Sequence, residues 1–204
     1  MTYLQSIDWL SISKPLAATV LLVALWAAES VAPMYLERRG RVQHGFRNLA
    51  LGLLNTLVVA VPFASVMLLV TQWAKHQAIG LGHWLTGPSW FQWVVLLLLF
   101  DAWMYLWHRL NHRVPLLWRF HAVHHSDREM DATSAFRFHT GEITLSFIAR
   151  LAVLPLLGMT MPQLLVYETI LLPVILFHHS NIRLPARADR WLRWLIVTPR
   201  MHWV

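Results

Sequence analysis

Long apolar runs alternate with short polar segments along the chain, and this pattern predicts a helical membrane protein. About 20 predominantly apolar residues cross the hydrocarbon core of a bilayer as one helix. Two such runs occupy the first half of the chain, and a third, rich in aromatic residues, opens at Trp90. Two further apolar stretches meet at Thr160 and Met161 and either span the bilayer or only dip into it. The five stretches are residues 16–36, 49–74, 90–107, 143–159 and 162–177.

The composition supports a membrane protein. Hydrophobic residues make up 57% of the 204 residues and charged residues 13%, about half of the roughly 25% that is typical of soluble domains. This excludes disorder. The formal net charge of +7 would suit nucleic acid only if the basic residues shared a water-facing surface. They lie between apolar blocks instead, so we expect no nucleic-acid binding.

The distribution of basic residues predicts the orientation in the membrane. Four arginines lie between the first two predicted spans, whereas the next connection holds only Lys75; the four are Arg38, Arg39, Arg41 and Arg47. By the positive-inside rule the first connection is cytoplasmic. Residues 108–142 and the tail from Ser180 then also lie on the cytoplasmic side. Arginine outnumbers lysine fifteen to two, which favours a GC-rich bacterial genome and hence the inner membrane.

Histidine is the residue type that suggests a chemistry. Cysteine is absent and nine of the twelve histidines lie at or after position 108, so imidazole is the available metal ligand. His108 and His112 are spaced HxxxH, which places both on one face of a helix. Residues 121–125 read HxxHH, which on a helix presents three more imidazoles together. The remaining candidate ligands are His178, His179 and His202.

Up to eight nitrogen donors from four segments exceed what one ion needs, so the sequence predicts two metal ions. The isolated histidines are expected to anchor at the interface or to make ordinary hydrogen bonds; they are His44, His76 and His83.

Several acidic and polar residues lie where they could support metal ligands. Asp101 shares a helical stripe of roughly 60° with His108 and His112, and a carboxylate that orients a ligating imidazole is common beside metal sites. Glu168 is nearly in phase with His179, which favours that residue over His178. His139 and Glu142 have two possible roles, either hydrogen bonding to ligands and shaping a substrate entrance, or starting a helix, where Glu142 would complement the helix dipole.

With these residues, the chain resembles the fatty acid hydroxylase and sterol desaturase superfamily of membrane di-iron enzymes. The resemblance runs from about Trp90 to the end, through WHRLNH, HAVHHS, RFHTGE, FHHSNI and TPRMH. It matches His108 and His112 to the first histidine box, residues 121, 124 and 125 to the second, His178 or His179 to the third region and His202 to the last. The family's last box reads HxxHH, whereas the sequence stops two residues after His202. We therefore expect it to be truncated inside that box.

The resemblance implies an all-α, multi-span helical membrane protein with a cytosolic, histidine-rich di-metal cap. Residues 1–89 would form a membrane anchor with two spans, and residues 90–204 the catalytic domain. Two non-haem iron ions would use O2 to hydroxylate or desaturate a lipid from the bilayer: a sterol, a fatty acyl chain or a related isoprenoid. The sequence has no G-x-G-x-x-G dinucleotide motif, so electrons are expected from a separate donor protein.

Two other functions are compatible with a histidine-rich membrane protein. A b-type haem electron carrier uses two histidines on facing spans, but adjacent histidines in HxxHH cannot both serve one axial position. A zinc or copper transporter predicts ligands at mid-membrane depth, whereas these histidines gather at the ends of spans. A membrane zinc protease is disfavoured because no H-E-x-x-H motif occurs. The sequence does not indicate an oligomeric state.

Overall fold

The structure is a computed structural model that describes residues 3–36 and 40–203, with side chains from residue 15 onward. Over these residues it is helical, and no strand occurs beyond a single bridge between Pro33 and Ile182. The predicted all-α, multi-span class is confirmed. The predicted cytoplasmic residues Arg38 and Arg39, and Val204 of the last box, lie outside the described residues.

Four helical segments within the described residues are long and apolar enough to cross a membrane. They are Arg41–Trp84, Ser89–Arg113, Thr140–Leu157 and Met161–His179, with a shorter apolar helix at Pro15–Val31. The predicted end of the first span at residue 36 is wrong. Helix α1 (Tyr3–Val31) stops at Val31, because Pro33 has no backbone N–H with which to continue it and the following residues bond elsewhere. Met34 N–H donates to the Asn181 carbonyl at 2.8 Å.

The chain divides into two compact units. Unit 1 comprises Met1–Gly52, Ser126–Arg137 and Glu168–Val204. It contains α1, most of α2 (Arg41–Asn55), the 3-10 helix η2 (Ala132–Phe136), the second part of α8 (Met161–His179), α9 (Ala186–Leu192) and α10 (Pro199–His202).

Close packing in unit 1 depends on glycine in α2. A Cβ at Gly45 would lie 2.4 Å from the Trp26 ring, and one at Gly52 would lie 2.8 Å from Phe136 Cβ. Neither contact leaves room for a larger residue, so these two positions set how closely α1 and η2 approach α2.

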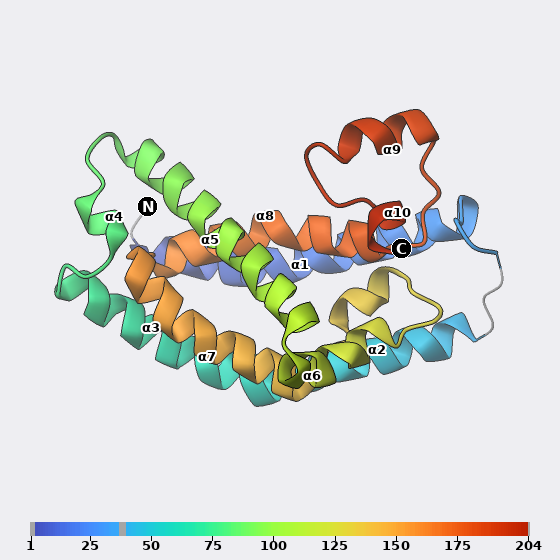
Figure 1. Cartoon of the computed structure of the whole chain (residues 1–204), viewed down its shortest axis with the longest axis horizontal. Coiled ribbons are helices and arrows are strands. Elements are labelled where there is room, and N and C mark those ends of the chain that lie inside the picture. Colours follow the sequence, from blue (N-terminus) through green and yellow to red (C-terminus); the bar gives the residue numbers. More distant parts are fainter. Residues whose placement is uncertain (1–2, 37–39, 204) are drawn as a thin grey trace. The chain divides into compact units, whose positions relative to one another are not determined.

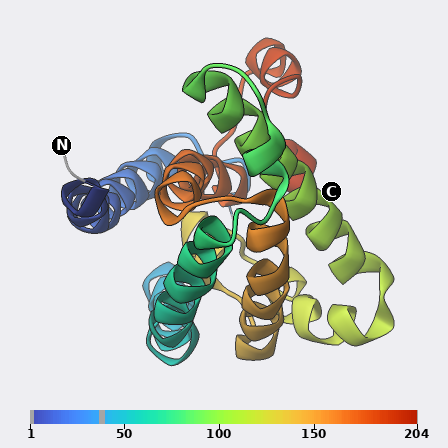
Figure 2. The same cartoon turned by 90° about the vertical axis from the view of Figure 1, so that its left-hand side faces the viewer.

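Unit 2 comprises Leu53–His125 and Phe138–Tyr167. It contains α3 (Val61–His76), α4 (Leu81–Trp84), α5 (Ser89–Arg113), α6 (Pro115–His125), α7 (Thr140–Leu157) and the start of α8. Helices α3 and α7 run side by side in both views (Figure 1 and Figure 2), with the Phe63 and Phe147 rings 5.6 Å apart. Gly80, directly before α4, lies against the end of α7. Its φ is +104°, and a Cβ there would lie 2.3 Å from Gly158 N.

A π-helical turn, η1 (Thr56–Ala60), joins α2 to α3. Pro62 lacks the N–H that would bond to the Val58 carbonyl, and a π turn is a common response to such a gap. Asn55, the residue directly before the turn, makes hydrogen bonds to the segment that leads into α7. Its side chain donates to the Phe138 carbonyl at 2.8 Å and accepts from the Thr140 hydroxyl at 2.8 Å. These bonds fix the start of α7, which carries Glu142.

Candidate metal centre

A sharp turn between α5 and α6 brings the first two histidine motifs together. Val114 is extended, with φ −90° and ψ 116°, because a residue that precedes proline avoids the helical region. Pro115 then starts α6, where its missing N–H costs no helical bond. The chain bends sharply between α5 and α6 (Figure 2). The His108 and His121 rings are 4.9 Å apart and the His112 and His125 rings 4.6 Å apart, so the last turns of the two helices lie together. The conditional prediction that HxxHH is helical is confirmed.

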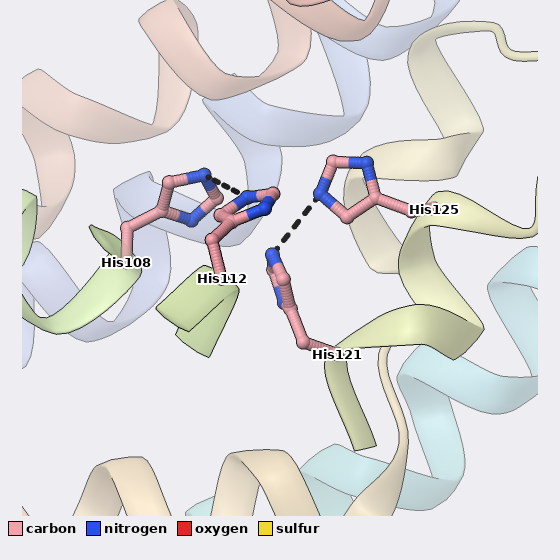
Figure 3. Close-up of side chains that lie close together, drawn as sticks. All are labelled: His108, His112, His121 and His125. Carbon is pink, nitrogen blue, oxygen red and sulfur yellow. Dashed lines mark hydrogen bonds between the residues drawn. The ribbon is translucent and has the colours of Figure 1, made fainter. Parts of the chain in front are cut away.

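Four imidazoles converge from these two helices (Figure 3). One nitrogen from each lies within 4.8 Å of the others, and the four residues are His108, His112, His121 and His125. The Nε2 atoms of His108 and His112 are 3.2 Å apart, and those of His121 and His125 are 3.1 Å apart. We call this group the four-histidine cluster.

The cluster fits a metal ion by spacing and by donor type. Two nitrogens that each lie about 2.1 Å from one ion are roughly 3.0–3.4 Å apart, and both Nε2 pairs meet this requirement. Imidazole suits zinc, copper, iron and nickel, so the donor set alone does not select the metal. His121 is fully buried, whereas His108 and His112 are exposed. One side of the cluster is therefore open to a ligand.

Glu142 determines which nitrogen of His121 faces the cluster. Its Oε1 lies 2.7 Å from His121 Nδ1, and both side chains are buried. The imidazole donates its Nδ1–H to this carboxylate, which leaves the Nε2 lone pair directed at the other histidines. Glu142 lies in the first turn of α7, where His139 is the N-cap residue and accepts from Gly141 N–H at 2.9 Å. His139 thus starts the helix that positions Glu142.

The fifth candidate ligand of unit 2, His124, lies beside the cluster, with its ring 5.5 Å from His121 and 5.1 Å from His125. His124 is buried on α6, and its ring stacks on Phe138 at 4.5 Å with an interplanar angle of 2°. Trp118 lies on the same helix, 5.4 Å from the His112 ring and 5.6 Å from the His125 ring. It covers part of the cluster with an apolar surface.

Unit 1 brings together the remaining three candidate ligands. His178 and His179 end α8, and the ring of each lies within 4.6 Å of His202 in α10. His179 is buried, and its Nδ1 donates to the Ile175 carbonyl at 2.7 Å. This bond makes Nε2 the ring nitrogen that carries the lone pair, which is the form of imidazole that binds a metal. The choice between His178 and His179 stays a prediction.

Asp101 lies in unit 2 on α5 and accepts a hydrogen bond from the buried Tyr167 hydroxyl at 2.9 Å. The Tyr167 ring also packs edge-on against Phe100 at 4.9 Å. The carboxylate is thus satisfied by a tyrosine of α8. A role for Asp101 in orienting a ligand stays a prediction.

Sequence reasoning assigned no role to the polar network that follows the second histidine motif. His44 was expected to anchor at the interface or to make a hydrogen bond, and it makes one to Asp127, from Nε2 to Oδ1 at 2.8 Å. Its Nδ1 lies 3.4 Å from Asp131, the N-cap residue of η2. Burial would raise the pKa of Asp127, but hydrogen bonds from His44 and Ser134 lower this pKa to about 2. The network fixes the loop that begins directly after His125.

Glu29 is a second residue whose role went unassigned, although it is the one charge in an apolar run. It is 2% exposed, and its Oε1 accepts backbone N–H groups from Ala132 and Asn181, both at 2.9 Å. Its Oε2 accepts from Arg41 at 2.8 Å. An ionisable residue inside a span usually has a specific partner. This rule would have predicted a buried partner for Glu29 from the sequence.

A known protein family and a curated relative each match part of this chain. The family described as fatty acid hydroxylase matches residues 93–204, a range that contains all eight candidate ligands. The chain is similar to the ornithine lipid hydroxylase OlsE of Rhizobium tropici, with 31% identity over 115 residues. These residues are 56% of this chain but 34% of the relative, so the match spans about a third of that protein's length. No solved structure matches. More than half of the chain fits the family over its histidine motifs, and the chain therefore belongs to the fatty acid hydroxylase family.

Proposed function

We propose that the chain is a membrane-bound, non-haem di-iron oxidoreductase that uses O2 to hydroxylate or desaturate a C–H bond of a lipid. The observation that carries the proposal is the convergence of four imidazole nitrogens within 4.8 Å of one another. Family membership supports iron over the other metals that imidazole accepts. The name of the relative supports a lipid as substrate and hydroxylation as the outcome.

The residues of the chain have separate tasks in this proposal. The four-histidine cluster holds one iron, and the candidate ligands of unit 1, which are His178 or His179 and His202, contribute to the second. His124 is a further candidate ligand. Bound iron would supply O2 activation and the oxidation of an unactivated C–H bond. Glu142 keeps His121 in the tautomer that binds metal. Trp118 limits water at the cluster, and the apolar helices give a lipid chain access from the bilayer.

The same proposal includes the organisation and location of the protein. Residues 1–89 are the membrane anchor and residues 90–204 the catalytic domain, which is supported by a family match that begins at residue 93. The histidines face the cytoplasm of a bacterial inner membrane. A separate protein delivers the electrons.

Metal analysis of the protein purified from membranes tests the chemistry. We expect iron, with two ions per chain, and loss of iron together with lipid oxidation in His121→Ala and His124→Ala. His76→Ala, a histidine on α3, is the matched control and should retain both. Stoichiometric zinc or copper without iron would reject the proposal in favour of a transporter, and a Soret band would reject it in favour of a haem carrier.

A further inference from the structure

Helix α9, the turn that follows it and the start of α10 present large apolar side chains and arginines on one short segment. We call residues 186–201 the Trp/Arg segment. Trp191, Trp194 and Leu195 are 67%, 81% and 83% exposed. Four exposed arginines accompany them: Arg187, Arg190, Arg193 and Arg200. Exposed apolar side chains gathered in this way usually mark a binding surface.

A membrane-spanning helix does not explain this exposure. The last of the candidate spans among the described residues ends at His179. Helix α9 has seven residues, about 10 Å of helix, against the roughly 30 Å of a hydrocarbon core. The segment begins seven residues after that span ends, which holds it close to the membrane surface.

The charge of the segment is one-sided. Asp189 is its one acidic residue, and Asp189 is buried. The carboxylate accepts from the Thr198 hydroxyl at 2.7 Å and pairs with Arg193. The remaining arginines therefore present positive charge to the surroundings without an exposed carboxylate in the segment.

The Asp189 contacts also give the segment a defined shape. The Thr198 bond links α9 to the N-cap of α10, and the turn between them is closed by backbone bonds from Leu195 and Ile196 to the Leu192 carbonyl, both 2.9 Å. Trp194 and Leu195 thus project from a closed turn.

We propose that the Trp/Arg segment is an interfacial anchor that lies on an anionic phospholipid surface, with Trp191, Trp194 and Leu195 inserted and the arginines at the headgroups. Tryptophan prefers the level of the headgroups, and arginine near an anionic surface adds attraction. A protein partner would leave two tryptophans and a leucine in water whenever it dissociated, which makes the membrane the better occupant. Because His202 follows the segment directly, this contact fixes the height of the His178, His179 and His202 group relative to the lipid.

A single fluorescent label tests the proposal in the whole chain. The sequence has no cysteine, so Trp194→Cys can be labelled uniquely with bimane and reconstituted into vesicles of phosphatidylcholine and phosphatidylglycerol. We expect nitroxide-labelled lipid to quench the label at position 194. We expect iodide to quench it about threefold less than a label at Ala186→Cys. Ala186 is the matched control, since it is exposed and points about 140° away from Trp191 on α9.

A charge variant tests the role of the arginines. Each arginine at an anionic surface changes partitioning about fivefold, so Arg187→Gln with Arg190→Gln should make the label at position 194 accessible to iodide. The Lys pair at the same positions should restore protection. Pure phosphatidylcholine vesicles should resemble the Gln pair.

Equal iodide quenching at positions 194 and 186, without quenching by labelled lipid, overturns the proposal and assigns the surface to a soluble, acidic partner protein. If the label at position 194 stays protected from iodide in pure phosphatidylcholine and in the Gln pair, the proposed role of the arginines is wrong. Neither readout needs bound metal or turnover, so the result is independent of the proposed oxidation.

Discussion

The hydrogen bond between Glu142 and His121 is the contact at the four-histidine cluster whose effect is easiest to isolate. Glu142→Gln keeps an acceptor for His121 Nδ1–H but removes the charge, and Glu142→Ala removes both. Loss of such a partner typically lowers metal affinity about 10- to 100-fold. We expect Gln near the lower figure and Ala near the upper one, measured as iron retained per chain during dialysis against a chelator.

The matched control for this series is Glu129→Gln, a carboxylate in the loop after α6 that has no place in the cluster. Helix content by circular dichroism should be the same in all three variants. If Glu142→Ala retains as much iron as the unaltered chain, the carboxylate serves only the start of α7.

The ligand candidates could be predicted from the sequence, but their supporting residues largely could not. HxxxH and HxxHH have short, regular spacing, and helical geometry converts that spacing directly into a shared face. Glu29 and Asn181 are 152 positions apart, and Asn55 bonds to Thr140, 85 positions away. No local pattern encodes such pairs, because they depend on how distant segments pack.

The turn at Val114 and Pro115 determines whether two helices face each other at the cluster. Proline at a compatible position stabilises a fold by about 0.4–1 kcal/mol, which corresponds to a two- to fivefold change in an equilibrium. Pro115→Ala should therefore weaken iron binding by about two- to fivefold. Iron titration of the metal-free protein measures the effect.

Pro88→Ala is the control for this change. Pro88 also precedes a helix, as the N-cap residue of α5, but at the end of α5 that is remote from the histidines. Equal losses of affinity in both variants would mean that the cluster does not depend on the α5 to α6 turn.

Helix boundaries were harder to predict than the helices themselves. Hydropathy placed the third span at residues 90–107, whereas α5 continues to Arg113 and includes both histidines of the first motif. Hydropathy missed this extension because polar residues at the end of a helix have the same hydropathy as those of a loop. The helical phase that Asp101 shares with His108 and His112 did predict it. Helix α5 ends at Arg113, because Val114 precedes proline and is extended. Hydropathy does not register this constraint.

Asp189 links α9 to α10, and this link should depend on pH. Burial would raise the pKa of Asp189, but hydrogen bonds from Thr198 and Arg193 lower it below the ordinary value of 3.8. A lowered pKa stabilises the fold above the ordinary value, and that stabilisation is lost as the pH falls through the folded-state pKa.

Asp189→Asn removes the charge and with it this dependence. The variant should be about 1.5–3 kcal/mol less stable near pH 6, since hydrogen bonds to a charged group contribute that much. The difference should shrink as the pH falls below 3.8. Thermal unfolding of the metal-free protein at several pH values, compared between variant and unaltered chain, measures it. A difference that stays constant down to pH 3 would contradict a charged Asp189.

At the scale of the whole molecule, unit 1 is assembled from three distant stretches of chain, and Glu29 contacts all of them. Its carboxylate receives N–H groups from Ala132 and Asn181 and the guanidinium of Arg41. Asn181 follows His179 by two residues, so the same carboxylate also fixes the backbone beside a candidate ligand. Without Glu29 the backbone N–H groups of Ala132 and Asn181 would be buried without this hydrogen-bond acceptor, which costs free energy of folding.

Breaking this junction should destabilise unit 1 in a way that a second change partly repairs. In Glu29→Gln one oxygen becomes an NH2 donor, which must face either Arg41 or a backbone N–H, and we expect a loss of about 3–5 kcal/mol. Adding Arg41→Gln replaces the unpaired cation with an amide that can accept, so the double variant should lose less than the sum of the single losses by about 0.5–3 kcal/mol. Titration with sodium dodecyl sulfate in mixed micelles, followed by helix content, measures each stability.

Arg47→Gln is the control, because Arg47 is an exposed residue of α2, the helix that carries Arg41. It should show no such coupling with Glu29→Gln. Strict additivity of the Glu29 and Arg41 changes would mean that the two side chains do not act as a pair, and that the backbone bonds to Ala132 and Asn181 carry the whole contribution of Glu29.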